Sequence, residues 1–163
     1  MAGFMKLDGM TGDSKNQAFE GYIRIDTMGS GINREIPESA RGNQRAKGHT
    51  TFGNISITRQ LDKSSTALQK RVAIGDVIPT VTIVFANMYG SAGKYQAYMT
   101  YTLSNVVLAS YSISCDSEGE DLPKEELELS YTKAIWKYTD FDEKGASAGN
   151  YEASYDLTTD TAT

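Results

Sequence analysis

Few side chains in this sequence could take part in chemistry, and they do not converge on one site. His49 is the only histidine and Cys115 the only cysteine. A zinc site needs several histidine or cysteine ligands, and a nucleophile needs a base beside it. The residues around these two positions meet neither condition. We therefore interpret His49 as a side chain at the edge of a strand and Cys115 as an unreactive thiol in a loop.

Two short motifs resemble ion or phosphate sites but have the wrong spacing. DSEGED, residues 116–121, carries four carboxylates. It lacks the full EF-hand pattern, and such charge runs usually face solvent. GSAGK, residues 90–94, lacks the four residues between glycines that a phosphate loop needs, and Tyr95 follows its lysine in place of serine or threonine. We interpret it as a hairpin turn. The sequence therefore predicts no catalytic residue, no metal and no cofactor, and the protein is not expected to be an enzyme.

The composition argues against nucleic acid and membrane partners. A net charge of −5 over 163 residues offers no broad positive field for phosphates or anionic lipids. No stretch approaches the roughly 18 apolar residues of a membrane span. Asp8 precedes any sustained apolar run, so we expect no cleaved signal peptide. The length suits one domain, residues 1–163, with a polar tail at about 158–163 that we expect to be disordered.

Short strand-like segments make up most of the chain. They alternate apolar and polar residues and are bounded by glycine, proline and asparagine, as antiparallel strands are. The segments are residues 4–8, 21–27, 49–61, 79–89 and 95–114. The last one is long enough to be two strands, or one strand bent across two sheets.

Residues 62–76 lose this alternation. Leu68 and Val72 lie one helical turn apart and Gly75 follows, which predicts a short helix over about 64–74. Residues 29–49 show no period, and we expect a long extended loop there. The predicted fold class is mainly β: an antiparallel β-barrel, or two packed sheets, with one short α-helix.

The segment EELELSYTKAIWKYT, residues 125–139, changes the phase of its apolar residues midway. A strand with one wet face keeps a single phase. A β-bulge near Thr132 would restore one buried face. Alternatively, the Ile135 face meets the core while Trp136 and Tyr138 on the other face meet another subunit, since a row of wet aromatic side chains is typical of an interface.

Four blocks of the sequence resemble one known family. They are FMKLDGMTGDS at 4–14, SITRQLDKSSTAL at 56–68, VVLASYSIS at 106–114 and EGEDLPKEELELSYTKAIWKYT at 118–139. In their order along the chain they are similar to the hemolysin-coregulated protein (Hcp) family, the inner-tube subunits of bacterial type VI secretion systems.

The resemblance implies a structural protein. Six copies would close into a ring, and rings would stack into a hollow tube that carries or chaperones effector proteins. Its partners would be its own copies, a contractile sheath, spike (VgrG-type) proteins and effectors, with no nucleic acid and no membrane. The protein would lie in the bacterial cytoplasm before firing and then be expelled to the extracellular space or a target cell.

The resemblance and the sequence pattern together assign roles to three groups of residues. Trp136, Tyr138 and Tyr131 are expected at the interface between protomers. Met28, Gly29 and Ser30 are expected to face the lumen, although Thr27–Gly31 stands where the family has aromatic residues before a glycine. The ring-stacking loop would use Arg34, Glu35, Arg41, Arg45 and Lys47.

A different class of function is the alternative. The ten tyrosines could serve as stacking platforms of a monomeric β-sandwich that binds a ligand of the carbohydrate type. Such a module would be stabilised by its ligand against heat without forming an oligomer.

Overall fold

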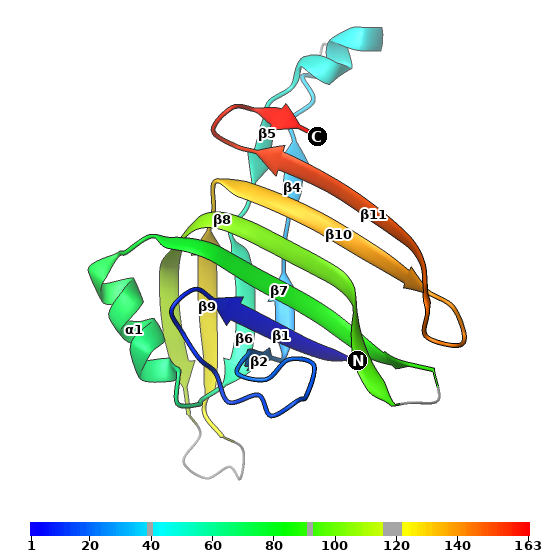
Figure 1. Ribbon diagram of the computed structural model, residues 1–163. Helices are drawn as coiled ribbons and strands as arrows, with labels where there is room; N and C mark the ends of the chain where they lie inside the picture. Colours follow the sequence, from blue (N-terminus) through cyan, green and yellow to red (C-terminus); the bar gives the residue numbers. More distant parts are fainter. Residues whose placement is uncertain (39–40, 91–92, 116–121) are drawn as a thin grey trace.

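The computed structural model describes residues 1–38, 41–90, 93–115 and 122–163, and the side chains of Gln44, Ala46 and Lys47 lie outside that description. Twelve strands, one α-helix and one 3-10 helix make up the described chain (Figure 1). The strands are β1 (Ala2–Leu7), β2 (Ile23–Ile25), β3 (Thr27–Gly29), β4 (Ile32–Arg34), β5 (Thr50–Phe52), β6 (Ile55–Gln60), β7 (Ile78–Tyr89), β8 (Lys94–Ser114), β9 (Lys124–Ser130), β10 (Lys133–Phe141), β11 (Ser147–Asp156) and β12 (Thr161–Ala162). The helices are η1 (Gly42–Lys47) and α1 (Ser65–Ile74). The predicted mainly β class with one short α-helix is confirmed, and the chain passes Gly75 in the left-handed conformation that ends α1.

The strands form two antiparallel sheets that share β8. Sheet A has the order β12-β11-β10-β8-β7-β1-β2, and sheet B joins β8 to β9, β6 and β3. On the opposite side the sheets meet where β2 passes directly into β3, and the Asp26 N–H donates to the Thr58 carbonyl at 2.8 Å. The sheets therefore close on each other as a barrel.

A bend in β8 lets one strand serve both sheets. Asn105 has φ of 50°, a left-handed conformation that asparagine tolerates better than most residues. Its side-chain amide donates to the Thr132 hydroxyl at 3.1 Å, and the Thr132 N–H donates to the Ser104 carbonyl at 3.1 Å. The bend is thus tied to the corner between β9 and β10. Of the two predicted possibilities for residues 95–114, the single bent strand is the correct one.

The same corner explains the change of phase in residues 125–139. Residues up to Ser130 belong to β9 in sheet B, and residues from Lys133 belong to β10 in sheet A. The odd positions Leu127 and Leu129 are fully buried, and in β10 the even position Ala134 is fully buried. The predicted bulge near Thr132 is wrong, because the chain changes sheet there.

The core lies between the two sheets. Its seventeen buried residues come from β1, β2, β6, β7, β8, β9, β10, α1 and the β9–β10 corner. A second, smaller cluster lies on the other face of sheet A, where Phe4, Val84 and Ala86 are covered by Phe19 of the loop between β1 and β2. Sheet A is therefore apolar on both faces over part of its area.

The segment predicted as an extended loop, residues 29–49, contains the short strand β4 and the 3-10 helix η1. The strands β4 and β5 pair from Ile32 opposite Phe52 to Arg34 opposite Thr50. With η1 they form a hairpin that projects away from the barrel (Figure 1). We call residues 31–53 the arm. Within the tail at about 158–163, β12 pairs with the end of β11.

A buried ion network fixes α1 to sheet B. Arg59 on β6 is 1% exposed. Its Nε lies 3.2 Å from a carboxylate oxygen of buried Glu125 on β9, its Nη1 donates to the Ser64 hydroxyl at 2.8 Å, and its Nη2 pairs with the Asp62 carboxylate. The Tyr111 hydroxyl donates to the other oxygen of Glu125. An arginine buried this deeply must be paired, so the network fixes where the segment before α1 can lie.

Asp62 is the acidic member of the network nearest the helix. Burial by itself would raise the pKa of the Asp62 carboxyl, but hydrogen bonds with Ser64 and Arg59 and the positive charge of Arg59 outweigh it and hold that pKa below its ordinary value. A carboxyl with a lowered pKa in the folded state adds stability above its unfolded pKa, and this contribution is lost as the pH falls through the folded pKa.

We therefore expect Asp62→Asn to reduce the free energy of unfolding at pH 7 by about 1–3 kcal/mol, because charge-assisted hydrogen bonds to a buried arginine are lost. The difference from the unmodified protein should shrink as the pH falls below about 4. Urea unfolding at several pH values and equal protein concentration measures both effects. Asp13→Asn is the matched control, since the Asp13–Lys63 pair is about half exposed on both sides and should contribute under about 1 kcal/mol. If Asp62→Asn lowered the free energy of unfolding equally at pH 7 and pH 3, the assigned role of the Asp62 charge would be contradicted.

Candidate assembly surface

The inner face of sheet A passes from buried to exposed along its strands. Val81, Leu103 and Ala134 are paired across β7, β8 and β10 and are fully buried. Two residues further along the strands, Ile83 is fully buried, but Tyr101 and Trp136 are only partly buried. This face therefore extends beyond the part that sheet B covers.

The next positions form a row of large apolar side chains across four strands. Phe85 on β7 pairs with Met99 on β8, Met99 pairs with Tyr138 on β10, and Tyr138 pairs with Tyr151 on β11. Tyr138 is 44% exposed and Tyr151 66% exposed, with ring centroids 6.4 Å apart. We call these four residues the apolar row. Exposed apolar side chains gathered in this way are typical of a surface that another protein covers.

Trp136 lies next to this row but is directed toward its own protomer. It packs against the main core, and its ring is stacked on Phe52 of the arm at a centroid distance of 6.5 Å. Phe52 also contacts Tyr155 on β11 at 4.6 Å. The expectation that the Ile135 face meets the core is wrong, because Ala134 and Trp136 are the residues of β10 that face it. Tyr131 lies in the core with 8% of its surface exposed.

The two chains of the arm are hydrogen-bonded to each other, and most of its described residues are exposed. Arg34 donates to the Thr50 hydroxyl at 2.7 Å, and the Glu35 N–H donates to the carbonyl of His49 at 2.9 Å. Residues 32–38 are exposed, and Ile32 and Ile36 are each 50% exposed. Gly48 lies so close to the Glu35 carbonyl that a Cβ atom would be 1.5 Å from its oxygen. Any other residue at this position would force the two chains of the arm apart.

The remaining residues of the predicted stacking loop lie on or before η1. Arg41 precedes η1 and Arg45 lies within it, and both are exposed. The side chain of Lys47 lies outside the described part of the structure. The arm thus carries exposed basic groups at its outer part and exposed isoleucines nearer its base.

The residues predicted to face a lumen divide between two sides of sheet B. Met28 on β3 packs against the core. Gly29 lies on the opposite face, where a Cβ atom would come within 2.5 Å of the Ser56 hydroxyl. The Thr27 and Thr58 hydroxyls are bonded at 2.6 Å on this face, and Asn54 donates to Glu128 at 3.1 Å. The outer face of sheet B is therefore hydrophilic, whereas the inner face of sheet A is not.

Groups with catalytic or metal-binding potential do not gather in the described residues. No cluster of three or more histidine, cysteine and acidic side chains that could hold a metal ion occurs among them. His49 is exposed in the arm, and Cys115 is an exposed free thiol. Residues 116–121 lie outside the description. Over the ranges that the structure describes, no helix has the length and apolar character needed to cross a membrane.

Two members of this surface escaped the sequence analysis. Phe52 looked like one residue of an ordinary alternating strand, and its contact with Trp136 joins residues 84 positions apart in the chain. Tyr151 stands in a polar segment, and only the register of β11 against β10 brings it beside Tyr138. One signal in the sequence could have found Tyr151: it shares its phase with Ala153 and Tyr155, as residues on one face of a strand do.

Comparisons with known proteins agree on one family. The family model for "Type VI secretion system effector, Hcp" matches residues 4–138. A solved structure described as a type six secretion system protein is 22% identical, with a TM-score of 0.90 and 99% of each chain covered. Hcp1 from Salmonella typhimurium is 23% identical, with a TM-score of 0.76, 99% of this chain and 98% of that chain covered. Hcp3 from Pseudomonas aeruginosa is 15% identical, with a TM-score of 0.65, covering 95% and 97%.

At these identities the solved structures show a shared fold. A comparison with curated protein sequences found no match.

Trp136 and Tyr138 should respond differently to truncation. We expect Trp136→Ala to lower the free energy of unfolding by about 2–4 kcal/mol, because the indole packs on both the core and Phe52. Tyr138→Ala should cost under about 1 kcal/mol in an isolated protomer, because its side chain is half exposed. Denaturant unfolding at a concentration where gel filtration shows monomer measures both values. Equal costs for the two variants would contradict the assigned orientation of β10.

Proposed function

The chain belongs to the Hcp family of type VI secretion system proteins, and we propose that it is a structural subunit of the inner tube, in which six copies close a ring and rings stack into a hollow tube. The observation that carries the proposal is the apolar row. It leaves Tyr138 and Tyr151 exposed, with Phe85 and Met99 partly buried beside them, at the open end of sheet A. A second copy of the chain is the occupant we assign to it.

Ring closure requires two different surfaces on each protomer. In a head-to-tail ring, one surface of each copy meets a different surface of the next. The apolar row supplies one of them. The arm, with exposed Ile32 and Ile36, supplies apolar side chains for the other. A stable contact would bury on the order of 800 Å² on each partner.

The charged outer part of the arm is suited to contacts between rings. Arg41, Arg45 and Lys47 there, together with Arg34 and Glu35 nearer the base, would meet charged residues of the adjacent ring. The protein is acidic overall, with a net charge of −5, so acidic partners are available on another copy. An exposed ion pair contributes under about 1 kcal/mol, so stacking depends on repetition around the ring and weakens with salt.

The remaining parts of the proposal, which concern the lumen, the sheath and the spike, are based on membership of the family. Gly29 and Ser30, with the hydrophilic outer face of sheet B, are assigned to the lumen, where effectors would be carried or chaperoned. The tube would lie within a contractile sheath, end in a spike (VgrG-type) protein and stay in the cytoplasm until it is expelled. The role is structural and assigns no catalytic step.

If six copies form a ring, the purified protein should have the mass of a hexamer. Native mass spectrometry of the purified protein should show a species near six times the protomer mass of 17.8 kDa. Tyr138→Ala combined with Tyr151→Ala should shift this species toward monomer while circular dichroism stays unchanged, because both side chains are exposed in the protomer. A folded protein that stays monomeric at tens of micromolar, or a double variant that still forms the full oligomer, would count against the proposal.

Stacking should respond to charge in the arm. We expect Arg41→Glu with Arg45→Glu to shorten tubes in negative-stain images and to leave single rings intact, because these side chains are assigned to the contact between rings. Lys70→Glu with Lys124→Glu is the matched control, since these exposed lysines lie outside the arm. If the arm variant breaks single rings into protomers, the outer part of the arm belongs to the contact within a ring.

A further inference from the structure

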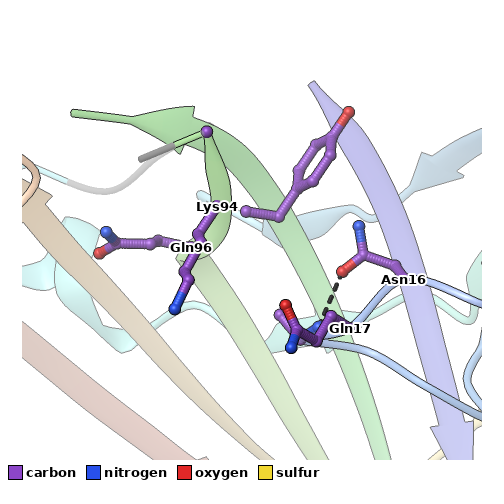
Figure 2. A pocket seen from close by; sticks show the side chains of 7 residues that line it. Asn16, Gln17, Lys94 and Gln96 are labelled. Atoms are coloured by element: carbon purple, nitrogen blue, oxygen red, sulfur yellow. Dashed lines mark hydrogen bonds between the residues drawn. The ribbon is translucent and has the colours of Figure 1, made fainter. Parts of the chain in front are cut away.

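A cleft opens where the loop between β1 and β2 faces the start of β8. Its volume is about 430 Å³. Figure 2 shows Asn16 and Gln17 of the loop on one side and Lys94 and Gln96 of β8 on the other. The lining residues are Asn16, Gln17, Ala18, Gly93, Lys94, Tyr95 and Gln96. Neither the apolar row nor the arm contributes to it.

A second cavity continues the cleft along the barrel. It measures about 300 Å³ and shares Asn16 and Tyr95 with the first. Lys15 and Arg24 also line it. Because they share two lining residues, the two cavities adjoin, and we call them together the groove.

The groove is built on a rigid floor. Phe4 stacks on Phe19 at 4.6 Å and meets the Tyr95 ring edge to face at 6.4 Å. Backbone hydrogen bonds close the loop above them, from Ser14 to the Tyr22 carbonyl at 3.0 Å and from Gly21 to the Ser14 carbonyl at 2.9 Å. A preformed groove loses little conformational freedom when a ligand binds.

The charge of the groove is opposite to that of the protein. Lys94 lies in one cavity and Lys15 in the other, and both side chains are exposed. Among the described residues neither lysine makes an ion pair, and no acidic side chain lines either cavity. In a chain with a net charge of −5, one lysine in each of two adjoining cavities favours an anionic ligand.

The amide side chains of the groove indicate what class of anionic ligand it binds. An amide both donates and accepts hydrogen bonds, as the peptide backbone does. The side-chain oxygen Oδ1 of Asn16 accepts from the Ala18 N–H at 2.9 Å, and the side-chain amide of Gln96 donates to the Gly145 carbonyl at 3.1 Å. These bonds hold both side chains in place and leave the Asn16 amino group and the Gln96 oxygen for a ligand.

We propose that this groove binds an extended acidic segment of a partner polypeptide. Carboxylates of the segment pair with Lys15 and Lys94, while its backbone bonds to the amides of Asn16, Gln17 and Gln96. The proposal uses neither the apolar row nor the arm, so it does not depend on ring formation.

A labelled synthetic peptide in which glutamate alternates with serine tests the assignment by fluorescence anisotropy on the full chain. The unmodified protein should bind it more tightly than the same peptide with lysine for glutamate, and binding should weaken with added salt. Lys15→Glu with Lys94→Glu should reduce the affinity by about tenfold or more, as the loss of two charge-assisted contacts implies. Lys70→Glu with Lys124→Glu is the matched control and should leave peptide binding unchanged, since both lysines are exposed and line neither cavity. Native mass spectrometry of each variant measures its oligomeric state independently of peptide binding.

Three outcomes would overturn the proposal. The first is equal binding of the acidic and basic peptides, or an affinity that the Lys15 and Lys94 changes do not alter. The second is tighter binding of a single-stranded DNA oligonucleotide than of the acidic peptide, which would make the ligand a nucleic acid. The third is no peptide binding together with a change of oligomer size in the Lys15 and Lys94 variant, which would make the groove a contact between copies of this chain.

Discussion

The architecture depends on one strand that hydrogen-bonds in two sheets. β8 pairs with β7 and β10 along its first part and with β9 along its last part. The bend at Asn105 directs these two parts into different sheets, and its hydrogen bond to Thr132 ties it to the neighbouring corner. Because strand pairing fixes register, the bend also determines which residues of β10 face inward. The burial of Ala134, the partial burial of Trp136 and the exposure of Tyr138 all follow from it.

Sheet B is stabilised differently from sheet A at the end near α1. Sheet A has buried apolar side chains on both faces over part of its area, whereas this end of sheet B holds a buried arginine and a buried glutamate. A buried ion pair often adds little net stability, but it tolerates few alternative arrangements. Arg59 reaches Asp62, Ser64 and Glu125 from one position. We therefore interpret the network as a device that fixes the position of α1 more than one that adds stability.

The sequence predicted best those features that local physics determines. The helix was predictable from the spacing of Leu68 and Val72 and from Gly75, because capping and helical periodicity act within a few residues. The arm was missed because β4 and β5 have three residues each and alternate too briefly to show a period. The prediction that the Trp136 side chain faces away from the core was wrong for another reason. The apolar residues of a sequence change phase in the same way whether a strand bulges or the chain passes from one sheet to another. Only the long-range pairing of β8 distinguishes these cases.

Trp136 is the only tryptophan of the chain, and it lies between the barrel core and Phe52 at the base of the arm. Indole emission depends on the polarity around the ring, so this protein contains an intrinsic optical probe at the joint between its rigid body and its projecting part. A displacement of the arm would wet one side of the ring and move the emission to longer wavelength, even if the barrel stayed intact. The position of the arm can therefore be followed in solution without a dye or label.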